Sequence, residues 1–108
     1  MTAISPLAPA SFPEIPAIAG VTFATHAAGL RYQGRPDLML AVLAEGTTVA
    51  GAFTRSLCTS APVDWCKANL GRGTARAVVC NAGNANAFTG SAGESATALT
   101  AEVLAGVL

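Results

Sequence analysis

The sequence predicts an α+β fold in which mixed β-sheets are layered with helices. Three observations predict it: short runs that are apolar or alternate in polarity, two segments with helical spacing, and turns rich in glycine or proline between them. Strands and helices follow one another without a strict βαβ rhythm, so we expect a mixed arrangement. We divide the chain into an extended arm at residues 1–18 and the N-terminal portion of a larger domain at residues 19–108.

The arm is rich in proline and has no cation near its start, so it does not resemble a signal peptide. Because loose arms are rarely so apolar, we expect Leu7, Phe12 and Ile15 to lie on the body of the protein. No run of ~20 apolar residues occurs, so the sequence predicts no membrane span. The prolines of the arm are Pro6, Pro9, Pro13 and Pro16.

Four strands are predicted. The segment Val21–His26 alternates apolar and polar side chains, as a half-buried strand does. The apolar run Asp37–Ala44 is followed by Glu45-Gly46, a turn signal, and then by Thr47–Thr54, which is rich in β-branched residues. This order favours an antiparallel hairpin of the two runs. Thr74–Cys80 is a further apolar strand, which directly follows the first predicted helix along the chain.

The first predicted helix begins at Ser60, whose side chain can cap free amides, with Pro62 in the first turn. It ends at Gly71 and Gly73. The second begins with the capping-box pattern Ser91-Ala92-Gly93-Glu94. Its apolar stripe is expected to face a core. The stripe consists of Ala96, Leu99, Val103 and Val107.

Charged residues make up 11% of the 108 residues, less than half the ~25% typical of soluble domains. A small domain alone needs a polar surface, so we expect further chain to cover much of this one. The end of the sequence at Leu108, inside an apolar pattern, favours the same interpretation. The net charge is zero and the basic residues are scattered, which argues against nucleic acid or an anionic membrane as a partner.

Cysteine usage indicates a reduced, cytoplasmic protein without a metal site. Cys58, Cys66 and Cys80 form no CxxC pair and no zinc-binding pattern, and their count is odd. His26, the single histidine, completes no recognised metal pattern with them. A catalytic pairing of His26 with Cys80 is conceivable, but a polar residue at the end of a strand is the simpler interpretation.

The segment from Asn81 to Gly90 lies between a predicted strand and a predicted helix. Helix N-termini stabilise anions, including a developing oxyanion, through free N–H groups and a positive dipole end. Glycines let the backbone turn sharply, and asparagines can hold it by hydrogen bonds. On physical grounds alone, a functional loop and a merely connecting loop are both open. The supporting residues are Asn81, Gly83, Asn84 and Asn86, and the candidate donors are Thr89 and Gly90.

This loop resembles the N-[SA]-G-N-A-N-A-x-T-G signature of the bifunctional ornithine acetyltransferase/glutamate N-acetyltransferase family. Weaker similarities accompany it in the same order and spacing, and together they cover about residues 13–108. They are Gly20-Val21, Gly29-Leu30-Arg31, Asp37-Leu38-Met39-Leu40, Ala50-Gly51-Ala52-Phe53-Thr54, and Ala61-Pro62-Val63 with Cys66. On this resemblance, residues 19–108 are the N-terminal portion of the family's α chain.

The resemblance implies the ornithine acetyltransferase/DmpA-like αββα architecture, present here in part. It implies transfer of an acetyl group from N-acetylornithine to glutamate in arginine biosynthesis, with acetyl-CoA as a further substrate of bifunctional members and no cofactor. The family enzyme is cleaved autocatalytically, which implies the β chain of the same precursor as partner and an α2β2 heterotetramer. The family's oxyanion hole corresponds to the Thr89 hydroxyl and the Gly90 amide.

The sequence departs from the family pattern at two loop positions and in one larger respect. Ala82 stands where many members have serine, and Phe88 where many have cysteine; both fit packing roles. The segment that carries the family's nucleophilic threonine does not occur in these 108 residues. Thr100 is no substitute, because it lies in the predicted helix. We therefore expect this chain alone to be inactive.

Two other hypotheses remain at this point. The same fold could serve an N-terminal-nucleophile aminopeptidase or amidase, although the loop signature argues against it. The chain could also be a non-catalytic module that binds an anion at Ser91.

Overall fold

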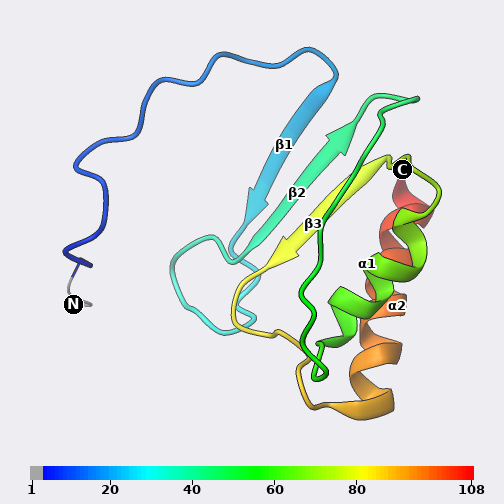
Figure 1. Ribbon diagram of the computed structural model, residues 1–108. Helices are drawn as coiled ribbons and strands as arrows, with labels where there is room; N and C mark the ends of the chain where they lie inside the picture. Colours follow the sequence, from blue (N-terminus) through cyan, green and yellow to red (C-terminus); the bar gives the residue numbers. More distant parts are fainter. Residues whose placement is uncertain (1–3) are drawn as a thin grey trace.

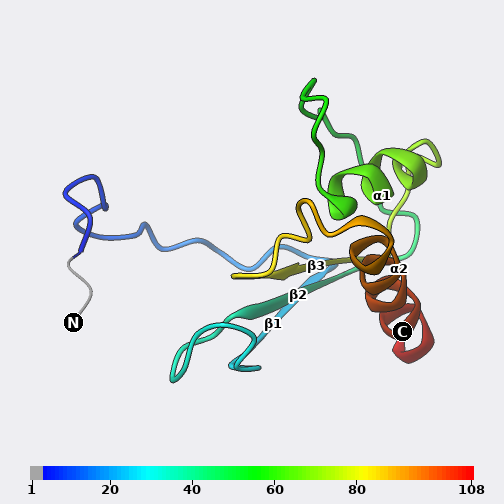
Figure 2. The same ribbon diagram turned by 90° about the horizontal axis from the view of Figure 1, so that it is seen from below.

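The computed structural model describes residues 4–108 and has an α+β fold, as the sequence predicts. Three strands, β1 (Val21–His26), β2 (Leu38–Leu43) and β3 (Ala77–Asn81), form one antiparallel sheet in the order β1-β2-β3. Figures 1 and 2 both place the helices α1 (Ala61–Leu70) and α2 (Gly90–Val107) together at one side of this sheet, beyond β3. The backbones of the two helices lie close together, whereas among the described residues neither helix has a Cα atom within 8 Å of a strand Cα.

The sheet forms where polarity alternates or where the chain is apolar throughout. β1 forms over the predicted segment, but its side chains do not alternate in burial: only Val21 is half-buried, and Phe23 is 65% exposed. β2 is the central apolar strand, in which Ala41 is only 5% exposed. In the register of the sheet, Ala41 lies between Phe23 of β1 and Val78 of β3. The most buried part of the sheet is therefore its middle strand, as two flanking partners require.

The predicted hairpin between Asp37–Ala44 and Thr47–Thr54 is wrong. β2 pairs with β1 on one edge and with β3 on the other, so no edge remains for residues 47–54. Those residues form only an isolated bridge between Thr48 and Thr74, supported by a hydrogen bond from the Val49 amide to the Gly73 carbonyl (2.9 Å). The β-branched residues indicated strand propensity, but the long-range pairing of β3 decided the sheet.

Both predicted helices are present, but their side-chain caps are not. Ser60 and Thr89 occupy the N-cap positions of α1 and α2, and neither side chain makes a capping hydrogen bond. The capping box predicted from Ser91 to Glu94 is wrong, because both residues already lie inside α2. An N-cap residue must have non-helical backbone angles, which Ser91 does not.

The face of α2 that becomes buried is also different from the predicted one. Leu99, Val103 and Val107 are 59%, 61% and 76% exposed, so within residues 4–108 this stripe faces no core. The covered face consists of three small residues and one leucine at helical spacing, and α1 packs against α2. Gly93 is buried in this face, and Thr97, Ala101 and Leu104 are half-buried.

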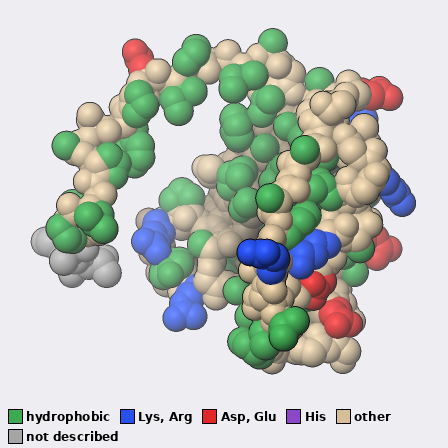
Figure 3. Space-filling view, in the orientation of Figure 1, with side chains coloured by type: hydrophobic (Ala, Val, Ile, Leu, Met, Phe, Trp, Pro, Cys, Tyr) green, Lys and Arg blue, Asp and Glu red, His purple; other side chains and the backbone are tan. Residues whose placement is uncertain are grey.

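The arm extends away from the sheet in Figure 1, and residues 4–19 contain no helix or strand. The expectation that Leu7, Phe12 and Ile15 lie on the body is wrong, since all three are largely exposed. Figure 3 shows apolar side chains along the arm and over the strands on the face toward the viewer. The described chain thus presents much apolar surface, in keeping with its low charge content.

Candidate active site

The predicted order of strand, loop and helix N-terminus is present. Asn81 ends β3, Gly90 begins α2, and the eight residues between them form neither helix nor strand. The loop lies at the end of the sheet where β2 begins, because Leu38 pairs with Asn81. Figure 1 shows it as the segment that passes from the lower end of β3 to the start of α2.

Three hydrogen bonds fix this loop. The Asn81 side-chain amide donates to the Asn84 carbonyl (3.2 Å). The Ala82 amide donates to the Asp37 carbonyl (2.8 Å), and the Ala61 amide donates to the Asn86 carbonyl (3.1 Å). The loop is therefore tied to the start of β2 near one end and to the start of α1 near the other.

The loop backbone is unusual, because four of its residues have positive φ angles. They are Gly83 (94°), Asn86 (46°), Phe88 (57°) and Gly90 (56°). Glycine adopts this region freely and asparagine tolerates it, whereas an aromatic residue there is rare. Phe88 is also well exposed, so no packing of its ring explains the conformation. Such backbone angles are concentrated at functional sites in proteins.

Thr89 and Gly90 lie together at the entrance of α2, an 18-residue helix. Both residues are exposed, and the Thr89 hydroxyl does not cap the helix. The first amides of a helix have no partner within it, and the helix dipole makes this end positive. The pair therefore presents two donors, a hydroxyl and an amide, at a position suited to an anion or an oxyanion.

Gly93 lies directly beneath this pair, a contact that the sequence did not reveal. A Cβ atom on Gly93 would overlap the Thr89 hydroxyl oxygen and would lie 3.0 Å from the Thr89 Cβ and 3.2 Å from the Asn86 Cβ. Real Cβ atoms essentially never approach another atom within 3.0 Å, so the overlap with the hydroxyl oxygen would force a shift, and the other two contacts are tighter than most. Only glycine at this position leaves room for the Thr89 side chain as it stands.

Asp37 is a second residue that sequence reasoning passed over, beyond its place in the apolar run. Its side chain is 4% exposed, and its two oxygens accept hydrogen bonds from the Ala28 amide (2.7 Å) and the Leu30 amide (2.6 Å). Burial alone would raise the pKa of this carboxyl, but the backbone amides of Ala28, Leu30, Arg31 and Gly29 outweigh it and lower the pKa below its usual value. Asp37 is thus an ionised anchor for the segment between β1 and β2.

Comparison with known proteins identifies the family of this chain. The family model described as the ArgJ family matches residues 22–108. The chain belongs to the ArgJ family. It is 59% identical over 104 residues to the arginine biosynthesis bifunctional protein ArgJ of Bradyrhizobium diazoefficiens, covering 96% of this chain and 25% of that protein. It is 61% identical over 108 residues to the protein of the same name from Nitrobacter winogradskyi, covering 96% and 26%.

A solved structure extends the similarity to the fold. Ornithine acetyltransferase from Mycobacterium tuberculosis, in complex with ornithine, matches this ArgJ-family chain with a TM-score of 0.73 and 43% sequence identity. The match covers 77% of this chain and 44% of that one. The chain spans about a quarter of the length of the curated ArgJ relatives it matches.

The conceivable pairing of His26 with Cys80 is excluded by the sheet. His26 pairs with Leu38 on one side of β2, and Cys80 pairs with Met39 on the other. Two strand spacings, about 10 Å, separate β1 from β3, and neighbouring positions along a strand point to opposite faces. All three cysteines are free and exposed, and within residues 4–108 no three His, Cys, Asp or Glu residues are grouped so that they could hold a metal ion.

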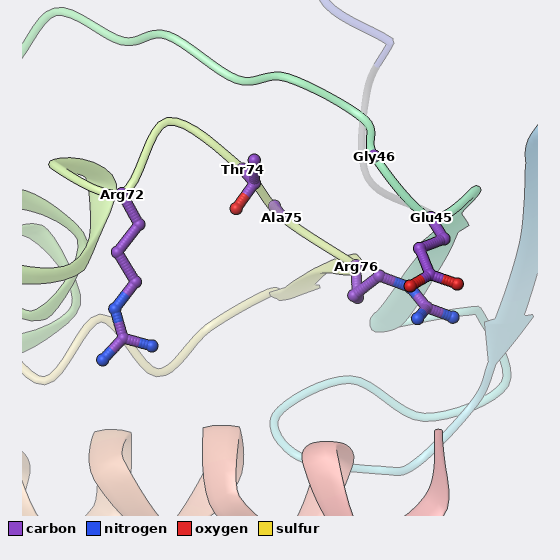
Figure 4. Close-up of a pocket in the computed structure, with 6 residues that line it drawn as sticks. All are labelled: Glu45, Gly46, Arg72, Thr74, Ala75 and Arg76. Carbon is purple, nitrogen blue, oxygen red and sulfur yellow. The ribbon is translucent and has the colours of Figure 1, made fainter.

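A shallow hollow of about 410 Å³ lies at the other end of the sheet, away from the loop. In Figure 4 the side chains of Glu45 and Arg76 lie toward each other, whereas Arg72 points away from them. The two arginines therefore do not converge on a common point, and we assign this hollow no function in the ArgJ-family chain. Within the described residues, neither helix is long and apolar enough to cross a membrane.

Proposed function

We propose that this ArgJ-family chain is part of an acetyltransferase of arginine biosynthesis that moves an acetyl group from N-acetylornithine to glutamate. The observation that carries the proposal is the pair of exposed donors, Thr89 and Gly90, at the N-terminus of an 18-residue helix. The names of the relatives and the ornithine held by the solved neighbour support the choice of substrates. We further propose acetyl-CoA as a second acetyl donor, since the relatives are called bifunctional.

In the proposed reaction, this segment supplies half of the active site. A threonine hydroxyl from another segment of the same precursor attacks the acetyl carbonyl carbon of N-acetylornithine. The carbonyl oxygen becomes an oxyanion, which accepts hydrogen bonds from the Thr89 hydroxyl and the Gly90 amide. Collapse breaks the C–N bond, a proton passes to the departing amine, and ornithine leaves an acetyl-threonine ester. The amine of glutamate then attacks the ester carbonyl carbon, the C–O bond to threonine breaks, a proton passes from the amine to the threonine oxygen, and N-acetylglutamate departs.

The proposal includes an arrangement of chains. The nucleophile lies in the β chain, two α and two β chains form the cytoplasmic enzyme, and residues 19–108 belong to the α-chain domain. The 108-residue chain alone is then inactive. Residues 81–86 hold the loop in shape through the Asn81–Asn84 and Ala61–Asn86 hydrogen bonds and the positive φ of Gly83.

The test is Thr89→Ala in the complete enzyme. Loss of one oxyanion-hole donor raises the barrier by about 3 kcal/mol, so kcat for acetyl transfer to glutamate falls roughly a hundredfold. Because the Thr89 side chain makes no capping hydrogen bond, the free energy of unfolding changes by less than the ~1 kcal/mol of an ordinary cap. Thr89→Ser keeps the hydroxyl and most of the activity.

The matched control is Thr100→Ala. Thr100 lies on the same helix, and its hydroxyl donates to the Ala96 carbonyl (2.8 Å) far from the loop. This variant keeps the wild-type kcat. Equal rates for Thr89→Ala and wild type contradict the oxyanion role. Hydrolysis of peptide amides in place of acetyl transfer from N-acetylornithine contradicts the proposed reaction and favours an aminopeptidase or amidase.

A further inference from the structure

The segment between β1 and β2 is folded around the carboxylate of Asp37. One oxygen accepts from the Ala28 amide at 2.7 Å and the other accepts from the Leu30 amide at 2.6 Å. The carboxylate is nearly inaccessible to solvent, so water does not compete well for these charge-assisted hydrogen bonds. They determine the path of residues 28–31, which contain no helix or strand.

This path brings Arg31 against the active-site loop. A Cβ atom added to Gly83 would lie 2.5 Å from both Cβ and Cδ of Arg31, and 3.0 Å from its Cγ. The stem of Arg31 therefore crosses Gly83 where a side chain would otherwise be. Figure 1 shows residues 27–36 beside the lower end of β3, where the loop begins.

The main chain of Asp37 holds the same part of the loop. Its carbonyl accepts the Ala82 amide at 2.8 Å, one residue before Gly83. Asp37 thus contacts the loop directly through its backbone and indirectly through Arg31. Both contacts act on the Ala82–Gly83 end, seven residues before Thr89 and Gly90.

We propose that Asp37 is a positioning residue for the Asn81–Gly90 loop and acts through Arg31, whose stem packs on Gly83. The catalytic consequence rests on the proposed function, whereas the effect on loop order does not. Asp37 touches no reacting atom. It keeps Arg31 in place, and Arg31 restricts the loop that presents Thr89 and Gly90. Misplacing catalytic donors by about 1 Å is enough to lower a rate roughly a hundredfold.

The experiment compares Asp37→Asn, Arg31→Ala and Arg31→Met with wild type in the complete enzyme. Asparagine keeps the size of Asp37 but has one acceptor oxygen, so its NH2 group faces one of the two backbone amides. Arg31→Ala removes the stem, and Arg31→Met restores most of it without the charge. The control is Arg35→Ala, which removes an arginine of the same segment that stacks on Tyr32 instead.

The first readout is hydrogen exchange of the amides at residues 82–90, measured by mass spectrometry. Exchange of this peptide is expected to rise several-fold in Asp37→Asn and Arg31→Ala, to return toward wild type in Arg31→Met, and to stay at the wild-type rate in Arg35→Ala. The second readout is steady-state acetyl transfer per folded enzyme. We expect kcat to fall roughly tenfold or more in the first two variants, with a smaller change in KM.

The outcomes separate this inference from the proposed function. Wild-type exchange at residues 82–90 in Asp37→Asn and Arg31→Ala overturns the inference, whatever the activity. Faster exchange with wild-type kcat overturns the positioning role. If the wild-type complete enzyme transfers no acetyl group, the proposed function is refuted. Hydrogen exchange at residues 82–90 then decides by itself whether Asp37 orders the loop. An equal effect of Arg31→Met and Arg31→Ala overturns the packing of the stem as the cause.

Discussion

Gly93→Ala provides a test of the site that moves the Thr89 hydroxyl without deleting it. The added Cβ would overlap that oxygen and lie 3.0 Å from the Thr89 Cβ, so the Thr89 side chain must rotate or the start of α2 must shift. Alanine is the better helix former by about 1 kcal/mol, whereas overpacking costs about 1–3 kcal/mol. The two effects oppose each other, so we expect the free energy of unfolding to fall by no more than about 2 kcal/mol.

Catalysis should suffer more than stability. A fully displaced hydroxyl forfeits about 3 kcal/mol of transition-state stabilisation, and a partly displaced one forfeits less, so kcat should fall roughly tenfold to a hundredfold. The assay is acetyl transfer from N-acetylornithine to glutamate by the complete enzyme, with thermal unfolding measured in parallel. Gly106→Ala is the matched control on the same helix, because an added Cβ there meets nothing within 4 Å.

A double variant decides whether Gly93 acts through Thr89. In Thr89→Ala there is no hydroxyl to displace, and only the contacts at 3.0 Å and 3.2 Å with the Cβ atoms of residue 89 and Asn86 remain, so adding Gly93→Ala should lower kcat far less than it does in wild type. The reasoning is refuted if Gly93→Ala keeps the wild-type kcat, or if the two substitutions multiply in their effects.

Three further predictions follow from other contacts. The pKa of Asp37 is lowered in the folded protein, so its carboxylate stabilises the fold while it is ionised. The difference in unfolding free energy between wild type and Asp37→Asn should therefore be constant above about pH 5 and shrink as the pH falls below about 4. Denaturant unfolding across that range measures it. Ala61→Pro introduces a residue that the first turn of a helix accepts, but it removes the amide that donates to the Asn86 carbonyl. The far-UV circular dichroism spectrum should be unchanged, while hydrogen exchange at residues 86–90 rises. Unchanged exchange would contradict a role for this hydrogen bond in holding the loop. Leu99 is 59% exposed in this chain, which spans a quarter of its relatives' length. Leu99→Asp should therefore be nearly neutral in the isolated chain, but it should destabilise the complete enzyme by at least about 2 kcal/mol if further chain covers this face. Thermal unfolding of both proteins measures the difference.

Local signals were enough to predict the elements that depend on neighbouring residues. The alternation in Val21–His26 and the apolar run before Glu45 predicted β1 and β2, and Pro62 with Gly71 bracketed α1. The prediction of a strand at residues 47–54 was wrong because strand propensity does not show which strand pairs with which edge. In the structure, β3 pairs with the edge of β2 that β1 leaves free. That choice depends on contacts between residues far apart in the sequence.

The candidate site likewise has features that local sequence signals predict and features that they do not. The loop, with Thr89 and Gly90 at a helix entrance, could be predicted from the order of strand, loop and helix together with the family signature, although its catalytic role stays a prediction. Asp37 and Gly93 could not. Asp37 looked like the polar edge of an apolar run, and Gly93 like one member of a capping box. The importance of Asp37 comes from backbone amides seven and nine residues away, and that of Gly93 comes from its close fit against Thr89.

The supports of the loop come from two separate bodies of the fold. The sheet holds the Ala82–Gly83 end through Asp37, and the helix pair holds the Asn86–Thr89 end through Ala61 and Gly93. No helix Cα lies within 8 Å of a strand Cα among the described residues, and the loop is one of three segments that join the sheet to the helices, with residues 44–60 and 71–76. A loop pinned at both ends by different bodies keeps its donors in place only while those bodies keep their relative position. The positive φ angles of Gly83, Asn86 and Phe88 lie within these two anchored ends, and that of Gly90 lies at the start of α2.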